Sequence, residues 1–128
     1  MYPANLYYTK DHEWLKVEGE EAVVGITDFA QQQLGDIIYA ELPPAGKDLE
    51  AHQVLGSLES VKSVSDIYCP VSGEVLGVNS ELSQAPDLIN KDPYGQGWLV
   101  RLKLKDKAEL DALMKAADYE KYLEGLEH

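Results

Sequence analysis

The sequence predicts one mainly β domain, a sandwich or flattened barrel with a short internal helix and helices at its C-terminus. Short runs rich in Val, Ile and Tyr follow one another through the middle of the chain, and Pro and Gly separate them at close spacing. Near the C-terminus the apolar spacing becomes helical, at Leu110, Leu113, Met114 and Ala117. A length of 128 residues fits a single domain.

The first expected elements are a hairpin and a short helix. The run "HEWLKVEGEEAVVGIT" predicts two strands joined by a turn at residues 18–21. In "TDFAQQQLGD", Asp28 and Gln31 have the spacing of a capping box, and Gly35 stands where a helix would end. A short helix should therefore follow the hairpin.

The middle and the end of the chain supply the remaining elements. Strands are expected in "DIIYAEL", "QVLGSL", "DIYCP" and "EVLGVN". The run "WLVRLKLK" alternates apolar and basic side chains, which is typical of a half-buried strand. Asp118 is expected to cap a further helical turn that carries Tyr122 and Leu123.

Charge and hydropathy exclude several classes of partner. With a net charge of −12 the chain has no basic stripe for nucleic acid, and anionic membranes are disfavoured for the same reason. No apolar run approaches the roughly 20 residues of a membrane helix, and "MYPANLYYTK" lacks the basic and apolar parts of a signal peptide. We therefore expect a cytoplasmic protein. The last residues, "LEH" (126–128), resemble the start of a vector-encoded histidine tag and are left out of the functional argument.

The residue types that usually catalyse reactions or bind metals show no such pattern. Cys69 is the single cysteine, precedes Pro70 in an apolar run and has no basic neighbour, so we expect a small buried side chain. His12, His52 and His128 lack the spacing of metal ligands. No phosphate-binding loop is present, and pairing any two of the 23 acidic residues from spacing alone would be arbitrary. We therefore predict no catalytic residue and no metal site.

One lysine is harder to explain. Lys62 stands in "LESVKSVSDIY", where no Gly, Pro, Asn or Asp lies between Ser60 and Ser65 to mark an ordinary turn. Strand-like segments flank it on both sides, so it should project from the tip of a hairpin, where a modifying enzyme can reach it. The alternative is a solvated turn lysine without a function.

Four separate blocks of the sequence, in order and at matching spacing, closely resemble the H-protein family of the glycine cleavage system. They are "DHEWLKVE", "VGITDFAQQQLGDIIYAELP", "ESVKSVSDIYCPVSGEVLGVN" and "LINKDPYGQGWLVRLK". The match runs from about Tyr8 to Tyr122, so the resemblance implies a single lipoyl-carrier domain with its core at about residues 8–122. The resemblance implies a lipoyl-domain-like β-sandwich, or barrel-sandwich hybrid, and a carrier that catalyses no step. It also implies that lipoate is attached to Lys62 through an amide, which removes the charge of the lysine.

The resemblance further implies a set of partner enzymes. The carrier would take the aminomethyl group of glycine from glycine decarboxylase, a pyridoxal phosphate enzyme, to an aminomethyltransferase that uses tetrahydrofolate. Dihydrolipoyl dehydrogenase would reoxidise the arm, and a lipoate ligase or an octanoyl or lipoyl transferase would attach it. We expect the carrier itself to be a monomer.

Several residues match positions that dock the arm in this family. Glu13 and Asp66 match the positions that bind the amine, and Asp11 is a weaker candidate at the same site. A charge-assisted bond from a cationic amine to a carboxylate is stronger than a neutral bond. Glu13 could instead be an ordinary strand-surface acid, and Asp66 could only hydrogen-bond the hairpin.

Other residues are expected to present the lysine to the modifying enzyme. These are the neighbours Glu59, Ser60, Val61 and Ser63. Gly73 is expected to form the turn opposite the lysine hairpin. The aromatic residues Trp14, Trp98 and Phe29 are assigned to packing.

Four alternatives stay open. In a biotin carrier the lysine would lie between methionines, whereas Val61 and Ser63 flank Lys62. A lipoyl domain of a 2-oxo acid dehydrogenase would be shorter and joined to a flexible linker, which this chain lacks. An H-like protein that serves mainly as lipoyl donor or relay to other complexes needs only the lysine and its presentation. An interaction module would leave the lysine unmodified.

Overall fold

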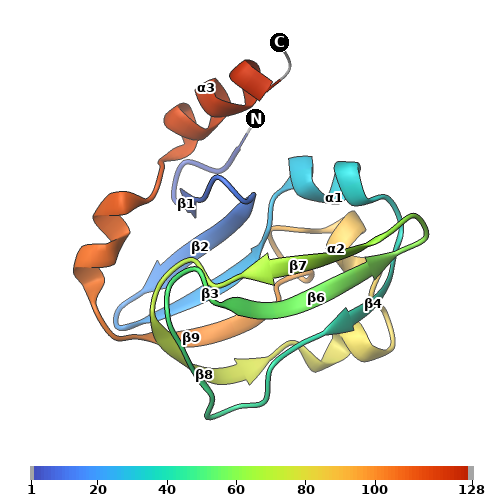
Figure 1. Cartoon of the computed structure of the whole chain (residues 1–128), viewed down its shortest axis with the longest axis horizontal. Coiled ribbons are helices and arrows are strands. Elements are labelled where there is room, and N and C mark those ends of the chain that lie inside the picture. The colour runs from blue at the N-terminus through green and yellow to red at the C-terminus, as the bar shows by residue number, and fades with distance from the viewer. Residues whose placement is uncertain (1, 127–128) are drawn as a thin grey trace.

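The computed structural model describes residues 2–126, and in that range nine strands form two sheets. The six-stranded sheet contains, in spatial order, β1 (Tyr7–Tyr8), β2 (Glu13–Glu18), β3 (Glu21–Ile26), β9 (Val100–Leu104), β8 (Gly73–Val78) and β5 (Asp48–Leu49). The three-stranded sheet contains β4 (Ile37–Glu41), β6 (Val54–Ser60) and β7 (Val64–Tyr68). The predicted mainly β fold and its N-terminal hairpin are confirmed (Figure 1).

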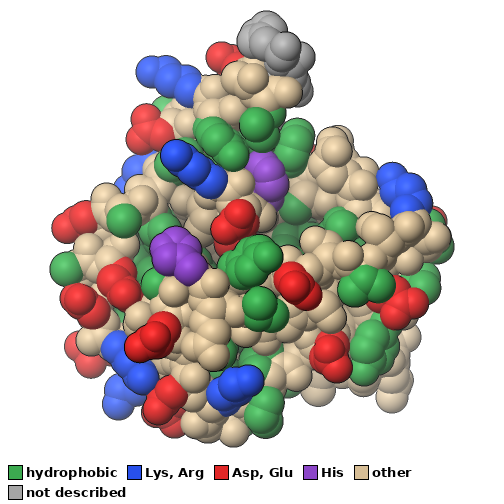
Figure 2. Space-filling view, in the orientation of Figure 1, with side chains coloured by type: hydrophobic (Ala, Val, Ile, Leu, Met, Phe, Trp, Pro, Cys, Tyr) green, Lys and Arg blue, Asp and Glu red, His purple; other side chains and the backbone are tan. Residues whose placement is uncertain are grey.

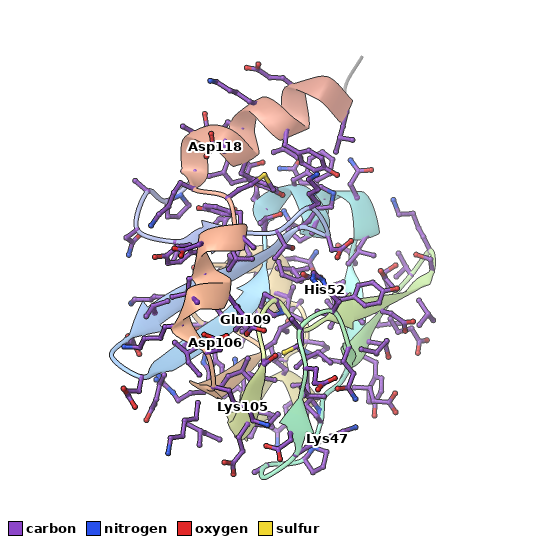
Figure 3. All side chains as sticks on the ribbon, turned by 60° about the vertical axis from the view of Figure 1, so that its left-hand side comes forward. Lys47, His52, Lys105, Asp106, Glu109 and Asp118 are labelled. Carbon is purple, nitrogen blue, oxygen red and sulfur yellow. The ribbon has the colours of Figure 1, made fainter. Side chains whose placement is uncertain are left out.

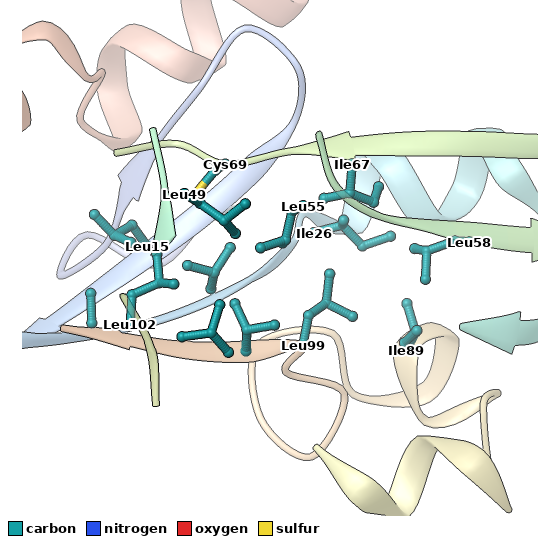
Figure 4. Close-up of a cluster of buried hydrophobic side chains, with 14 of the residues drawn as sticks. Leu15, Ile26, Leu49, Leu55, Leu58, Ile67, Cys69, Ile89, Leu99 and Leu102 are labelled. Atoms are coloured by element: carbon teal, nitrogen blue, oxygen red, sulfur yellow. The ribbon is translucent and has the colours of Figure 1, made fainter. Parts of the chain in front are cut away.

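The main core lies between the two sheets. Figure 4 shows Leu15 and Leu102 of the larger sheet facing the space that Leu55 and Ile67 of the smaller sheet enter from the other side. These side chains are at most 5% exposed, so the sheets are held by apolar burial. Cys69 belongs to this core as predicted, and burial raises the pKa of its thiol to about 12.

The short helix α1 (Asp28–Leu34) follows β3 and ends at Gly35, as predicted. The prediction that Asp28 caps it is wrong by one residue. Thr27 has extended backbone, and its side-chain oxygen accepts the N–H of Ala30 at 3.2 Å. Asp28 is already helical and accepts instead from the Gln31 side chain at 2.8 Å.

The predicted helical spacing over residues 110–117 is interrupted in the structure. A 3-10 helix, η2 (Lys107–Ala112), ends before Met114, which exchanges two backbone hydrogen bonds with Tyr8 at 2.8 and 2.9 Å. Asp118 lies inside the first turn of α3 (Ala116–Leu126) and is not its cap. Figure 3 places Asp118 on α3 and Glu109 on η2.

The other helical segments are short. A 3-10 helix, η1 (Ser80–Ser83), and α2 (Leu88–Lys91) lie between β8 and β9. Leu126 ends α3, and the rest of the suspected tag, residues 127–128, lies outside the described residues. Across residues 2–126, no helix has the length and apolar character to cross a membrane. The cytoplasmic location stays a prediction.

A second, aromatic cluster joins α3 to the sandwich, and Figure 1 shows α3 beside β1. The rings of Tyr8 in β1 and Tyr119 in α3 are stacked, with centroids 4.8 Å apart and planes 7° from parallel. Trp14 is buried in the same cluster, and Phe29 and Trp98 pack against it, so the assignment of these three side chains to packing is confirmed. The cluster holds the C-terminal helix against β1 and β2.

The prediction that Gly73 forms a turn is wrong. Gly73 is the first residue of β8, where it pairs with Leu49 on one side and Leu104 on the other. A Cβ at this position would lie 2.8 Å from the carbonyl oxygen of Lys103 and 3.2 Å from the Leu102 Cβ. Glycine is needed here because another backbone approaches closely.

Gly73→Ala should therefore destabilise the fold by about 1–3 kcal/mol, because the carbonyl of the neighbouring strand must move. Gly77→Ala, in the same strand, is the matched control because nothing lies within 4 Å of its new Cβ, and it should change stability by less than about 0.5 kcal/mol. Urea unfolding of both variants measures the difference. Equal stabilities would contradict the close-approach argument.

Candidate functional site

Lys62 lies at the tip of the β6–β7 hairpin, as predicted, and its side chain is exposed. Ser60 closes the turn with its side chain. Its Oγ accepts the backbone N–H groups of Lys62 at 3.2 Å and Ser63 at 3.1 Å, while its own N–H bonds the Ser63 carbonyl at 2.8 Å. The Ser60 hydroxyl thus bonds the backbone of its own turn, as Asn and Asp side chains do in other turns.

The lysine stem lies against the end of α1. A Cβ built on Gly35 would be 3.0 Å from Cε of Lys62, and the backbone φ of Gly35 is +80°. The N–H of Val61 donates to the Asp36 carbonyl at 3.1 Å, so the hairpin tip is also tied to the segment after α1. The Lys62 side chain therefore lies beside the C-terminal end of α1.

Asn90 in α2 fixes the segment beneath the lysine. Its Nδ2 donates to the Gln31 side-chain oxygen and to the Gly35 carbonyl, both at 2.9 Å. Its Oδ1 accepts the N–H of Ile37 at 2.9 Å. One amide thereby joins α1, the residue under Lys62 and the start of β4.

A cavity of about 260 Å³ runs along the same helix. α1 supplies Phe29, Gln33 and Leu34 to its wall, and Leu34 is the residue before the glycine that the lysine stem covers. The opposite walls come from β7 and from the turn before β2. Two larger hollows, of about 390 and 460 Å³, lie beside η1 and contain none of the predicted site residues.

Two of the three predicted carboxylates line this cavity, Asp66 from β7 and Asp11 from the turn before β2. Glu13 does not line it and is no surface acid, because only 1% of it is exposed. It accepts hydrogen bonds from the Thr9 hydroxyl at 2.7 Å and from the Tyr68 N–H at 3.2 Å. Burial raises its pKa to about 7, and no cation within residues 2–126 pairs with it.

Sequence reasoning missed His12, Gln33 and Leu34 as wall residues, and it gave Phe29 a packing role alone. The Phe29 ring packs against the His12 ring at 4.7 Å, and both line the cavity. The sequence held no signal for these wall residues, because it does not show how deeply a helix is buried. In the structure none of the seven residues of α1 is fully buried, although Ala30 and Leu34 pack against the main core, so part of the apolar surface of the helix is left to line the cavity.

The expected presenting residues surround the hairpin tip. Tyr39, Glu59 and Val64 stand directly opposite one another across the three strands and are all exposed. Six of the eight large hydrophobic residues that are exposed within residues 2–126 belong to this sheet or its tip. They are Ile38, Tyr39, Val54, Val61, Val64 and Tyr68. Figure 2 shows apolar side chains among acidic ones over the front of β6 and β7.

Two facing sheets with a lysine at a hairpin tip define a lipoyl-domain-like barrel-sandwich protein. Residues 6–126 match the family model of the glycine cleavage H-protein, and the chain belongs to that family. The glycine cleavage system H protein of Symbiobacterium thermophilum is 53% identical over 120 residues, which are 94% of each chain.

Two further relatives agree with this assignment. Glycine cleavage system H protein 1 of Caldanaerobacter subterraneus is 55% identical over 94% of this chain and 95% of its own. The crystal structure of a glycine cleavage system H protein from Mycobacterium marinum superposes with a TM-score of 0.82 at 35% identity, covering 92% of this chain and 95% of that chain. The resemblance of the four sequence blocks is thus confirmed.

The buried carboxyl of Glu13 should make stability depend on pH. Its pKa is raised from 4.5 to about 7, so between these values the folded state binds more protons than the unfolded state, and the free energy of unfolding falls as pH rises. The full loss is on the order of 3 kcal/mol. Glu13→Gln should flatten this part of the profile, measured by urea unfolding from about pH 4 to about pH 8. An unchanged profile would show that Glu13 does not titrate as its burial indicates.

Proposed function

We propose that the protein is a cytoplasmic carrier of the glycine cleavage system with lipoate attached to Nζ of Lys62. The observation that carries this proposal is an exposed lysine, free of ion pairs within residues 2–126, on a hairpin tip fixed by Ser60 in a chain of this family. When attached, the dithiolane accepts the aminomethyl group of glycine together with two electrons. The chain itself binds and shelters the loaded arm and presents it to other enzymes, and it catalyses no step.

The partners of such a carrier follow from its cargo. We assign the supply of the aminomethyl group to the pyridoxal phosphate enzyme glycine decarboxylase and its removal to a tetrahydrofolate-dependent aminomethyltransferase. Dihydrolipoyl dehydrogenase would restore the disulfide. Because Lys62 is joined to the domain by its own hairpin, the domain can meet each enzyme in turn with the same tip.

The cavity beside α1 fits the loaded end of an arm that starts at Lys62. Phe29 and Leu34 offer apolar surface, while Asp66 and Asp11 offer carboxylates to an ammonium group. An aminomethyl thioether loses formaldehyde and ammonia in water, so exclusion of water from this cavity prolongs its lifetime. Glu13 lies behind the wall and adds negative charge to the site when it ionises.

The apolar and acidic face of the small sheet fits the enzyme that attaches the arm. A bare lysine is short, so a lipoate ligase or a transferase must bring its active site against the tip itself. β4, β6 and β7 carry the acids Glu41, Glu59 and Asp66 and no Lys or Arg. This face, with Val61 and Ser63 at its end, therefore suits an apolar surface with a basic border.

Co-expression with a lipoylating enzyme and lipoate should add one lipoyl group to the chain, on Lys62 alone. Intact-mass and peptide mass spectrometry measure the increment and its position. Lys62→Arg keeps the positive charge but cannot form the amide, so it should stay unmodified. A wild-type chain that stays unmodified in the presence of an active enzyme would contradict the carrier proposal. It would favour the alternative of an interaction module with an unmodified lysine.

Asp66→Asn should shorten the lifetime of the loaded protein, because a carboxylate that holds the ammonium becomes a neutral amide. We expect roughly threefold to tenfold faster release of formaldehyde when the compared samples are all fully lipoylated before loading. Glu41→Gln is the matched control, since Glu41 lies in the same row of the sheet as Asp66 but does not line this cavity. Equal release rates in the two variants would remove Asp66 from the site.

A further inference from the structure

A chain of three hydrogen-bonding side chains ends at the cavity, and the proposed carrier function does not explain it. Nδ1 of His12 lies 2.9 Å from the hydroxyl of Tyr119, and that hydroxyl lies 2.8 Å from Oγ1 of Thr27. These residues come from the turn before β2, from α3 and from the cap of α1. His12 lines the cavity.

Counting donors and acceptors fixes the direction of this chain. Oγ1 of Thr27 already accepts the N–H of Ala30, Thr27 is fully buried, and Tyr119 is the one further partner of its hydroxyl within residues 2–126. Thr27 must therefore donate its proton to the Tyr119 oxygen. The reverse direction would bury a hydroxyl proton without an acceptor, which is costly.

The direction determines which nitrogen of His12 carries the proton. Since Thr27 donates to the Tyr119 oxygen, the proton of the Tyr119 hydroxyl needs another acceptor, and the remaining partner of that hydroxyl within residues 2–126 is Nδ1 of His12. Nδ1 therefore carries a lone pair and no proton. Burial lowers the pKa of His12 and Asp11 opposes this change, so the ring is neutral and its proton is on Nε2. The ring nitrogen left for a guest is therefore a donor, which an ammonium group cannot use.

We propose that Tyr119 and Thr27 are positioning residues that hold His12 as an Nε2–H donor, and that this donor binds the sulfur of the arm freed when its disulfide opens. The inference rests on the proposed lipoyl function. Opening the ring leaves one sulfur carrying the aminomethyl group and the other as a thiol or thiolate. The cavity then has separate partners for two atoms, with carboxylates for the ammonium and His12 for the free sulfur.

The surroundings of His12 agree with this role. Its φ of +70° is rare for a residue with a side chain, and its carbonyl accepts the N–H of Thr27 at 3.0 Å, so the ring is held in one place. The titratable groups around the ring are Asp11 beside it, Asp66 across the cavity, and the hydroxyls of Tyr119 and Tyr122 on α3. A hydrogen bond from a neutral donor stabilises a thiolate relative to its thiol.

Tyr119→Phe tests the proposal because it removes one hydroxyl and keeps the ring. Tyr8→Phe is the matched control: Tyr8 is the other half of the same ring stack, and its hydroxyl donates to the Pro3 carbonyl instead. The first measurement is the ¹⁵N chemical shifts of the His12 ring in the unmodified protein. Wild type and Tyr8→Phe should show the Nε2–H form, and Tyr119→Phe should show a mixture of both tautomers. An Nδ1–H ring in the wild type would overturn the positioning claim.

The second measurement is alkylation of the reduced, lipoylated protein across pH. Because the mixture of tautomers leaves the donor form only partly populated, the more reactive thiol of Tyr119→Phe should alkylate roughly twofold more slowly near neutral pH, while Tyr8→Phe matches wild type. Equal rates in all three proteins would overturn the sulfur assignment. A chain that cannot be lipoylated would refute the proposed function instead, and the tautomer result would stand apart from it.

Discussion

The side-chain amide of Asn90 is the interaction on which the arrangement of the site depends. Its three hydrogen bonds reach the middle of α1, the Gly35 carbonyl and the first N–H of β4. α1 has seven residues, too few for a stable isolated helix, so its position must come from such contacts. The cavity wall and the bed of the Lys62 stem consequently share one support, and their relation to each other stays fixed.

The cavity exists because the molecule has two apolar cores that do not merge. Ile26 and Ile67 reach its wall from the core between the sheets, and Phe29 reaches it from the aromatic cluster under α3. Without the C-terminal helix, the side of the sandwich beside β2 would lack the ring of Tyr119 that anchors His12. The helical segments added to the sandwich thus help to form this cavity as well as stabilise the sandwich.

Local patterns predicted most of the fold and the position of the lysine. Alternation identified the strands, and the Pro and Gly residues separated them, because these signals act within a few neighbours. The errors came from longer-range constraints: Met114 leaves the helix because Tyr8 pairs with it, and Gly73 is fixed by the neighbouring strand. His12 was missed because its partner is 107 residues away in the sequence, which no local pattern shows.

In the proposed carrier, charge explains how the cavity would hold an aminomethyl-loaded arm more tightly than an empty one. Glu13 has no cationic partner within residues 2–126 and a pKa raised to about 7, so in the empty cavity burial favours its protonated, neutral form. An ammonium group brought to Asp66 and Asp11, as proposed, would favour the ionised form of Glu13. The differential affinity of the cavity for the two states of the arm comes from the charge that only the loaded state carries. When the amine leaves, that attraction is lost, and the neutral arm would be held more weakly, by the apolar wall of α1 and the proposed His12 donor.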